Sequence, residues 1–209
     1  MRKILLKTIL IFVTMPLLIS AQPLNFGNTY TISSGADGYG RPRVALTNNQ
    51  PIVIWRKDST PKTIRASKWN GTGFSNPYNI TLSGVLPDSW DGPELATKGD
   101  TVYVVFTSTA TTQSSIMLIR SFDGGNTFSD TIRVSENNPS HKFRMGNIKI
   151  DQNGHPIVSY MQYLLNWTEP KQMVNRSITY GDSFIGSTEG SFSAPGEPCD
   201  CCKSSLILD

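Results

Sequence analysis

The sequence predicts an all-β fold, a β-propeller of four-stranded antiparallel blades. Three observations lead to this prediction. Hydrophobic residues make up only 38% of the 209 residues, and no segment shows a clear helical period. Short strands that end in an aromatic residue recur about every 50 residues. A turn of nearly constant composition recurs with them, and four short strands per repeat are typical of propeller blades.

The first two strands of each repeat form a hairpin. The second strand is expected at Pro51–Trp55, Thr101–Phe106 and Pro156–Tyr160, and its final aromatics are 51 and 54 residues apart. The first strand is expected just before it, at Arg43–Leu46, Glu94–Thr97 and Asn147–Ile150. Polar, turn-forming residues separate the two strands each time, as a hairpin requires.

A third strand then leads into the recurring turn. In the second repeat this turn is Ser121–Phe128, Ser-Phe-Asp-Gly-Gly-Asn-Thr-Phe, and Ser67–Phe74 and Ser177–Phe184 keep its Ser, Gly and Phe. Asp and Gly suit a tight turn, and Phe can fill the space beneath it. Fourth strands are expected at Tyr78–Thr81 and Thr131–Val134. A β-sandwich with accidental spacing is the alternative, which three features recurring in register disfavour.

Ser121–Phe128 matches the Asp-box, the Ser-x-Asp-x-Gly-x-Thr-aromatic repeat. On this motif the chain resembles the sialidase-like Asp-box (BNR-repeat) propellers, of the exo-α-sialidase-like type secreted by Bacteroidetes. The resemblance covers residues from about 37 to the end. It implies six blades in a complete chain. It also implies a structural role for the box residues, which are Ser121, Asp123, Gly125, Thr127 and Phe128.

The chain is expected to divide into three regions. Residues 1–21 resemble a signal peptide, with Arg2 and Lys3 before an apolar run and small residues at its end. A membrane anchor is the alternative, but Lys7 and Pro16 interrupt a run too short to span a bilayer. Residues 22–36 form a lead-in segment, and 37–209 form a partial propeller. The signal peptide predicts a secreted, periplasmic or cell-surface protein.

The propeller is predicted to hold about three and a half blades. These are residues 37–84, 85–137 and 138–195, with the first strand of a fourth blade in 196–209. The resemblance implies further blades beyond residue 209, and a ring completed by oligomerisation is the alternative. The family's nucleophilic tyrosine comes from a late blade, so the chain is expected to be inactive by itself.

The charge of the chain disfavours a nucleic-acid partner. Three of the 19 Lys and Arg residues lie in the first 21 residues, which hold none of the 16 acids. The remainder therefore has equal numbers of basic and acidic residues, whereas nucleic-acid binding requires a basic excess. No later segment is apolar enough to span a membrane.

The candidate site is expected where the first strand of each blade begins, together with the loop that follows the second strand. Aromatic residues there can stack on sugar rings, and arginines can hold a carboxylate. The resemblance implies arginines for the substrate carboxylate and an acid for proton transfer. The candidates are Arg41, Arg56, Trp90, Arg144 and Tyr163 for substrate binding, and Asp58 and Asp91 for catalysis.

These residues predict an exo-glycosidase acting on terminal acidic sugars such as sialosides. The alternatives are a non-catalytic cell-surface propeller that binds a glycan or a protein, and a structural module of a larger protein. A glycan is the expected partner, and no cofactor is expected.

Three cysteines, Cys199, Cys201 and Cys202, form a Cys-x-Cys-Cys group. This group lacks the paired spacing of a zinc site, so no metal ligand is predicted. An odd count in an oxidising compartment predicts a disulfide partner in a missing C-terminal region. A thiolate metal site is the alternative.

Overall fold

The computed structural model describes residues 27–33, 40–81, 84–85, 91–108 and 114–208. The chain divides into two compact units, residues 1–30 and 31–209. All described strands belong to the second unit. The predicted signal peptide lies outside the described residues, as does much of the lead-in segment. Within the described ranges the chain forms no helix that could cross a membrane.

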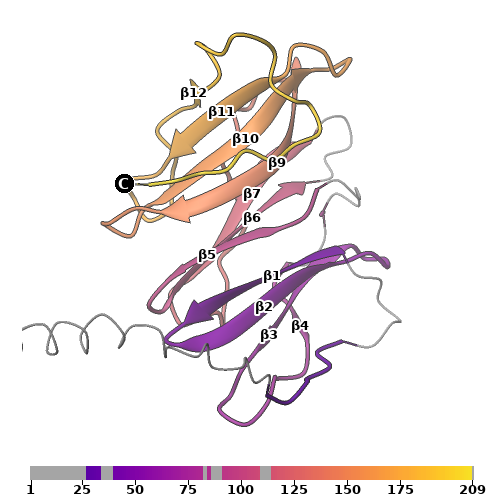
Figure 1. Ribbon diagram of the computed structural model, residues 1–209, viewed down its shortest axis with the longest axis vertical. Coiled ribbons are helices and arrows are strands. Elements are labelled where there is room, and N and C mark those ends of the chain that lie inside the picture. Colours follow the sequence, from indigo (N-terminus) through magenta and orange to yellow (C-terminus); the bar gives the residue numbers. More distant parts are fainter. Residues whose placement is uncertain (1–26, 34–39, 82–83, 86–90, 109–113, 209) are drawn as a thin grey trace, which may run out of the picture. The chain divides into compact units, whose positions relative to one another are not determined.

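The described residues form three four-stranded antiparallel sheets (Figure 1). Each sheet follows the chain order, from β1 to β4, β5 to β8 and β9 to β12. The first contains β1 (Gly40–Thr47), β2 (Gln50–Lys57), β3 (Thr63–Lys68) and β4 (Tyr78–Asn79). The second contains β5 (Glu94–Lys98), β6 (Thr101–Ser108), β7 (Ser115–Ser121) and β8 (Ile132–Arg133). The third contains β9 (His141–Ile150), β10 (Pro156–Leu164), β11 (Lys171–Arg176) and β12 (Thr188–Glu189).

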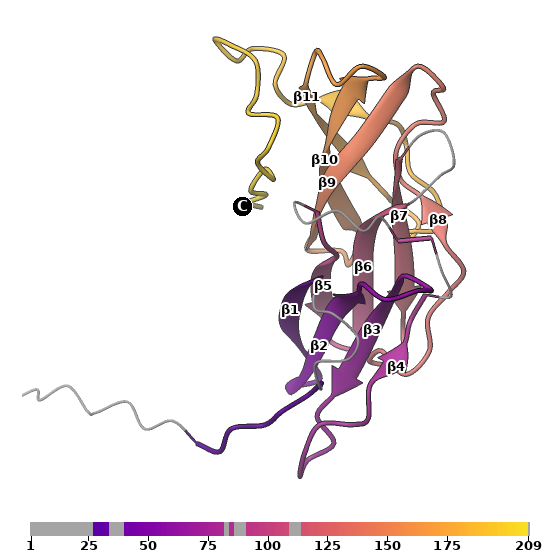
Figure 2. The ribbon, with the colours of Figure 1, turned by 90° about the vertical axis from the view of Figure 1, so that its right-hand side faces the viewer.

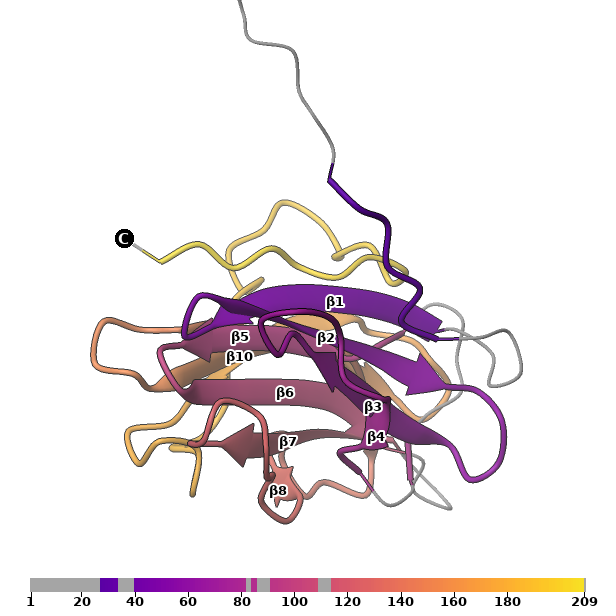
Figure 3. The same ribbon diagram turned by 90° about the horizontal axis from the view of Figure 1, so that it is seen from below.

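Each sheet is a blade, with its first strand innermost. The strands β1, β5 and β9 contact one another in that order. Figure 2 shows β1 and β5 on one side of the molecule and the short strands β4 and β8 on the other. Figure 3 shows the order from β5 to β8 within the middle blade. The all-β propeller prediction is confirmed, and the described residues make three blades of it.

The core lies between the blades because side chains of the middle blade alternate between its two faces. Along β6, Val102, Val104 and Phe106 pack against the first blade, in a cluster with Ile52, Ile54 and Ile64. Tyr103 and Val105 point the other way and pack with Phe143, Ile148 and Tyr160 of the third blade. All five β6 residues are buried. Burial on both faces explains why β6 is almost continuously apolar.

The predicted start of a fourth blade stays a prediction. Residues 196–208 form no strand, because no ladder partner for them lies within the described ranges. Side-chain bonds hold this segment instead: Asn147 Nδ2 donates to the Ser204 carbonyl at 2.6 Å, and the Ser159 and Ser204 hydroxyls lie 2.7 Å apart. Figure 1 shows the yellow segment passing beside the third blade. The third blade does have a fourth strand, β12, which was not predicted.

Candidate functional site

The candidate site begins with two irregular inner strands. The pairing of β1 with β2 shifts register between Gly40 and Arg43, and the pairing of β9 with β10 shifts between Ser159 and Met161. Arg41 and Met145 have positive φ angles of 45° and 60° at these irregularities. Bulges of this kind redirect side chains and are frequent beside functional sites. The two irregularities lie at corresponding ends of the first and third blades.

Arg56, at the end of β2, joins the two predicted acids. Its Nε donates to Asp58 Oδ1 at 2.5 Å, and its Nη1 donates to the backbone carbonyl of Asp91 at 2.6 Å. A Cβ on Gly40 would lie 2.7 Å from Arg56 Nε, so glycine makes room for the guanidinium. The predicted residues Arg56, Asp58 and Asp91 therefore lie together at one end of the blades.

The Asp91 carboxylate is buried, with 2% of the residue exposed. Its Oδ2 accepts hydrogen bonds from the Thr107 hydroxyl and from the Met145 amide, the latter at 3.0 Å. Its Oδ1 lies 3.6 Å from Lys203 Nζ. A general acid must lie within hydrogen-bond reach of its substrate. Asp91 is placed instead to tie the second blade to the third and to the C-terminal segment.

Lys203 also joins a second acid, Glu94. Its Nζ lies 3.0 Å from Glu94 Oε1 and donates to the Gly92 carbonyl at 2.8 Å. Arg43 donates to both Glu94 oxygens at 2.6 Å, a bidentate pair. Desolvation acts to raise the pKa of Glu94, but the bonds and charges of Arg43 and Lys203 outweigh it and lower that pKa. Glu94 is therefore held as a carboxylate between two cations.

Arg41 lies on the exposed side of this network. A Cβ on Gly92 would lie 2.6 Å from Arg41 Cβ, so the two backbones are closely packed beside Asp91. Trp90 lies outside the described residues. Asp58 has 35% of its side chain exposed, so its carboxylate is more accessible than that of Asp91.

Arg144 and Tyr163 belong to an adjoining group, the Trp167 cluster, which also contains Lys142 and Trp167. Lys142 Nζ and Arg144 Cζ each lie 4.2 Å from the centre of the Trp167 ring. Tyr163 packs edge-on against the same ring, with centroids 5.5 Å apart. Since both cations lie over the indole, the ring holds their charged ends in place. The cluster concentrates positive charge next to Met145, and so next to Asp91.

A cavity of about 220 Å³ adjoins the Trp167 cluster, lined by Arg144, Met145, Tyr163, Trp167, Asp200 and Cys201. Tyr163 is buried, and its hydroxyl donates to the Asp200 carbonyl at 2.7 Å. Burial and the nearby charge of Asp200 raise the pKa of Tyr163 to about 12. The phenol therefore stays protonated at neutral pH and positions the loop that carries Asp200.

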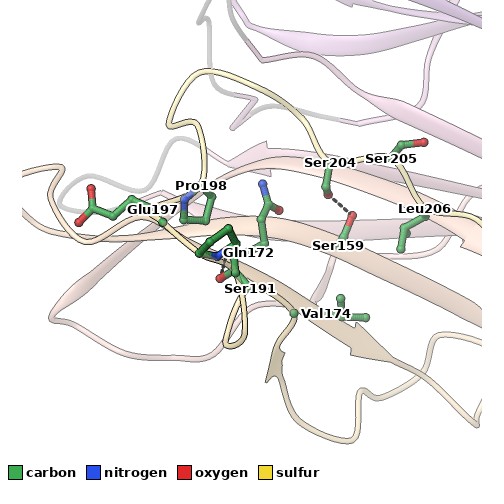
Figure 4. A pocket seen from close by; sticks show the side chains of 13 residues that line it. Ser159, Gln172, Val174, Ser191, Glu197, Pro198, Ser204, Ser205 and Leu206 are labelled. Atoms are coloured by element: carbon green, nitrogen blue, oxygen red, sulfur yellow. Dashed lines mark hydrogen bonds between the residues drawn. The ribbon is translucent and has the colours of Figure 1, made fainter.

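A larger cavity, of about 710 Å³, has a different character (Figure 4). It lies between the outer face of the third blade and the segment 190–206, and Val174, Pro198 and Leu206 are among its walls. Among the described residues that line it, Glu197 is the single ionisable one. A catalytic pocket needs several convergent polar groups, so this cavity is a poor candidate for the site.

The Ser121–Phe128 turn lies at the opposite end of the middle blade. Its Gly124 amide donates to the Asp100 carbonyl in the turn between β5 and β6. The Asp123 carboxylate accepts bonds from the Ser121 hydroxyl at 2.6 Å and from the Thr127 hydroxyl and amide. Desolvation opposes these bonds, yet they hold the pKa of Asp123 well below its ordinary value. Phe128 packs against the first inter-blade cluster.

Sequence reasoning missed Lys203, Thr107, Lys142 and Trp167. Lys203 carried one available signal: it stands three residues before Leu206, as Arg41 and Met145 stand before Val44 and Ile148. Thr107 lies one residue before the end of the buried strand β6. The sequence does not indicate which group its hydroxyl binds. Trp167 lies in the loop between β10 and β11, and the corresponding loop between β2 and β3 contains no aromatic residue.

No protein-family model matches the sequence, and no curated protein matches it. Solved structures do match. The chain is 18% identical to a Hadza microbial sialidase, with a TM-score of 0.52, over 70% of this chain and 36% of that one. A Penicillium chrysogenum α-L-arabinanase complexed with arabinobiose is 12% identical, with a TM-score of 0.58, over 76% and 52%. An endo-arabinase from Bacteroides thetaiotaomicron is 13% identical, with a TM-score of 0.53, over 78% and 59%.

At these identities the similarity concerns the fold. The chain has a sialidase-like propeller architecture, as the sequence predicted, and spans about a third to three fifths of the length of these three structures. The narrower resemblance to secreted Bacteroidetes proteins stays a prediction.

Proposed function

We propose that this chain belongs to a secreted, glycoside-acting propeller whose substrate is a terminal acidic sugar, such as a sialoside. One observation carries the proposal. Lys142 and Arg144 are both held over the Trp167 ring, beside a cavity of about 220 Å³. Ligand pockets commonly start at about 300 Å³, so this cavity suits one sugar ring better than a long chain.

The charges support an acidic ligand. Arg144 lines the cavity, Lys142 lies over the Trp167 ring that also lines it, and Arg41 lies exposed near Asp91. Arginine binds a carboxylate with two parallel hydrogen bonds, and a neutral sugar has no carboxylate. The solved structures with this fold include a sialidase and two arabinanases, which supports a glycan ligand of either kind. The positive charges of Lys142 and Arg144 favour an acidic glycan over a neutral one.

Asp58 is the acid we assign to proton transfer. Its carboxylate is partly exposed and fixed by Arg56 at 2.5 Å, whereas Asp91 is buried with its Oδ2 accepting two hydrogen bonds. In this assignment Asp91 positions Arg56, Met145 and Lys203. The positive cluster then binds the substrate carboxylate, and Asp58 faces the glycosidic oxygen.

A second function, glycan binding without turnover, is favoured by the burial of Asp91. Because Asp91 is buried, Asp58 is the one accessible acid of the two that the sequence predicted. Glycoside hydrolysis ordinarily uses a pair of groups, so a site with one of them binds rather than cleaves.

Two measurements test these functions: binding is measured on this chain, and turnover on a protein with the full ring of blades that the resemblance implies, because the nucleophile is expected in a later blade. Calorimetric titration with a sialyl-oligosaccharide is expected to show binding, and the matching desialylated oligosaccharide is expected to show none. Arg144→Ala is expected to weaken binding about tenfold or more, since charged hydrogen bonds contribute about 1.5–3 kcal/mol. The exposed Lys149→Ala is the matched control. Equal binding of the two oligosaccharides would remove acidic-sugar specificity.

Turnover is measured separately with a fluorogenic sialoside. Hydrolysis that Asp58→Asn abolishes, with binding retained, supports the glycosidase. Binding without hydrolysis supports the second function.

A further inference from the structure

The three cysteines converge on one point in the loop beside the Trp167 cluster. Cys199 Sγ lies 2.9 Å from Cys201 Sγ and 3.2 Å from Cys202 Sγ, and the latter two lie 3.7 Å apart. All three residues are exposed. Successive side chains of an extended segment point in opposite directions. Here a turn at residues 200–201 brings three neighbouring thiols to the same side.

This triangle fits a shared cation better than a disulfide. Sulfur ligands lie about 2.3 Å from a tetrahedral zinc ion, which places them roughly 3.8 Å from one another. The observed separations of 2.9–3.7 Å open to that spacing with small torsional changes. A disulfide requires about 2.05 Å and joins two sulfurs. A disulfide would leave the third thiol unbound, whereas one cation can bind all three.

The donor atoms are soft. The cluster consists of Cys199, Cys201 and Cys202, and no described histidine or carboxylate belongs to it. Met145, a thioether, lines the same cavity as Cys201. Thiolates and thioethers suit Cu(I), zinc and iron–sulfur clusters. Structural zinc sites and iron–sulfur clusters ordinarily take four protein ligands, so a group of three thiolates favours Cu(I).

The loop is held at two points. The Tyr163 hydroxyl binds the Asp200 carbonyl at 2.7 Å, and Lys203 binds the Gly92 carbonyl and Glu94. The three thiols therefore lie on a segment that is anchored to two blades, which lowers the entropic cost of gathering them around an ion.

We propose that Cys199, Cys201 and Cys202 bind one Cu(I) ion as three thiolates. Each thiol gives its proton to solvent when it binds, and the copper remains in the monovalent state throughout. The copper proposal does not rest on glycan binding by the Trp167 cluster, although Cys201 lines the cavity that adjoins that cluster.

The test is an anaerobic titration of the fully reduced chain with Cu(I), against a chromophoric Cu(I) chelator. We expect one equivalent of copper per chain and an ultraviolet thiolate-to-copper charge-transfer band. The variants Cys199→Ser, Cys201→Ser and Cys202→Ser should each weaken binding on the order of 100-fold or more, since even outer-shell changes cost 10–100-fold. Ser205→Ala, in the same segment, is the control and should bind as the parent chain does.

Far-ultraviolet circular dichroism checks that each variant folds, which is expected because the cysteines are exposed. A parallel titration with Zn(II), against a zinc chelator, tests the choice of ion. Tighter retention of zinc than of copper overturns the assignment to Cu(I). Unchanged copper uptake in the triple serine variant, or no uptake by the reduced chain, overturns the site.

Discussion

At the scale of single residues, Gly125 shows how tightly the turn of the middle blade is specified. Its φ angle is +82°, and a Cβ there would lie 2.7 Å from Ile52 Cδ1 of the first blade. Both backbone strain and a steric clash therefore oppose any side chain. The turn joins two blades as well as two strands, because Tyr78 also donates to the Gly125 carbonyl at 2.6 Å.

Gly125→Ala is expected to lower the free energy of unfolding by about 1–3 kcal/mol, the cost of a strained backbone position. Urea unfolding followed by tryptophan fluorescence measures it. Gly73→Ala is the matched control: it lies in another turn, meets nothing within 4 Å and has no positive φ. That control should change stability little, or raise it by roughly 0.4–1 kcal/mol. Equal losses in both variants contradict the packing argument.

Glu94 predicts an acid-sensitive contribution to stability. Its pKa is lowered in the folded state by Arg43 and Lys203, against the opposing effect of burial. A carboxyl with a lowered pKa stabilises the fold above its unfolded pKa, about 4.3, and loses that contribution as the pH falls through its folded pKa.

Glu94→Gln is therefore expected to cost about 1–2 kcal/mol at pH 7, a value reduced from that of a fully buried pair because the group is partly solvated. The difference from the parent chain should shrink as the pH falls below about 4. Urea unfolding at several pH values measures it. Glu169→Gln, at an exposed position, serves as the control. A cost that stays constant from pH 7 to pH 3 rules out this linkage.

At the scale of elements, the repeat predicted the hairpins because alternating apolar residues and polar turns are local signals. The strands extend beyond the predicted cores; β9 begins at His141 rather than at Asn147, because its bulged part carries polar residues. β12 was missed because Thr188–Glu189 lies in a stretch of polar residues and glycines, whereas the segments of β4 and β8 contain apolar residues. Residues 196–208 form no strand, because a strand depends on a partner and the described residues provide none for this segment.

For the candidate site too, the part that depends on local sequence could be predicted and the part that depends on other segments could not. Arg56, Asp58 and Asp91 come together because each directly follows or precedes a predictable strand. Which of the two acids is accessible depends on burial, and burial depends on Thr107, Met145 and Lys203 from three other segments. No local pattern contains that information.

Lys203 is expected to anchor the C-terminal segment. Lys203→Met removes the cation that faces Asp91 and Glu94, and should destabilise the chain by about 1–3 kcal/mol, less than a fully buried pair would cost. Limited proteolysis within residues 199–208 should accelerate more than cleavage in β2 or β3, because side-chain contacts to its carbonyls hold this segment in place of a strand ladder. Lys149→Met, an exposed change on β9, should leave both unchanged. Uniform acceleration across all three blades contradicts a local anchoring role.

At the scale of the whole molecule, the middle blade is the shared partner of the other two. Its two faces belong to separate clusters, with Val104 packed towards the first blade and Val105 towards the third. Both valines are fully buried on the same strand. Among the described residues, none of the first sheet belongs to the cluster between the second and third blades. The two interfaces can therefore be weakened one at a time.

Val104→Ala and Val105→Ala form a matched pair for this test, because they differ mainly in the interface they face. Each should cost about 1–3 kcal/mol through the lost methyl groups and the cavity left behind. Since each blade packs only on its neighbours, stability should resemble a sum of blade and interface contributions. Hydrogen exchange should therefore accelerate mainly in β2 and β3 for Val104→Ala, and mainly in β9 and β10 for Val105→Ala. If either substitution accelerates exchange equally in the first and third blades, the three blades open as one cooperative unit and the nearest-neighbour description is wrong.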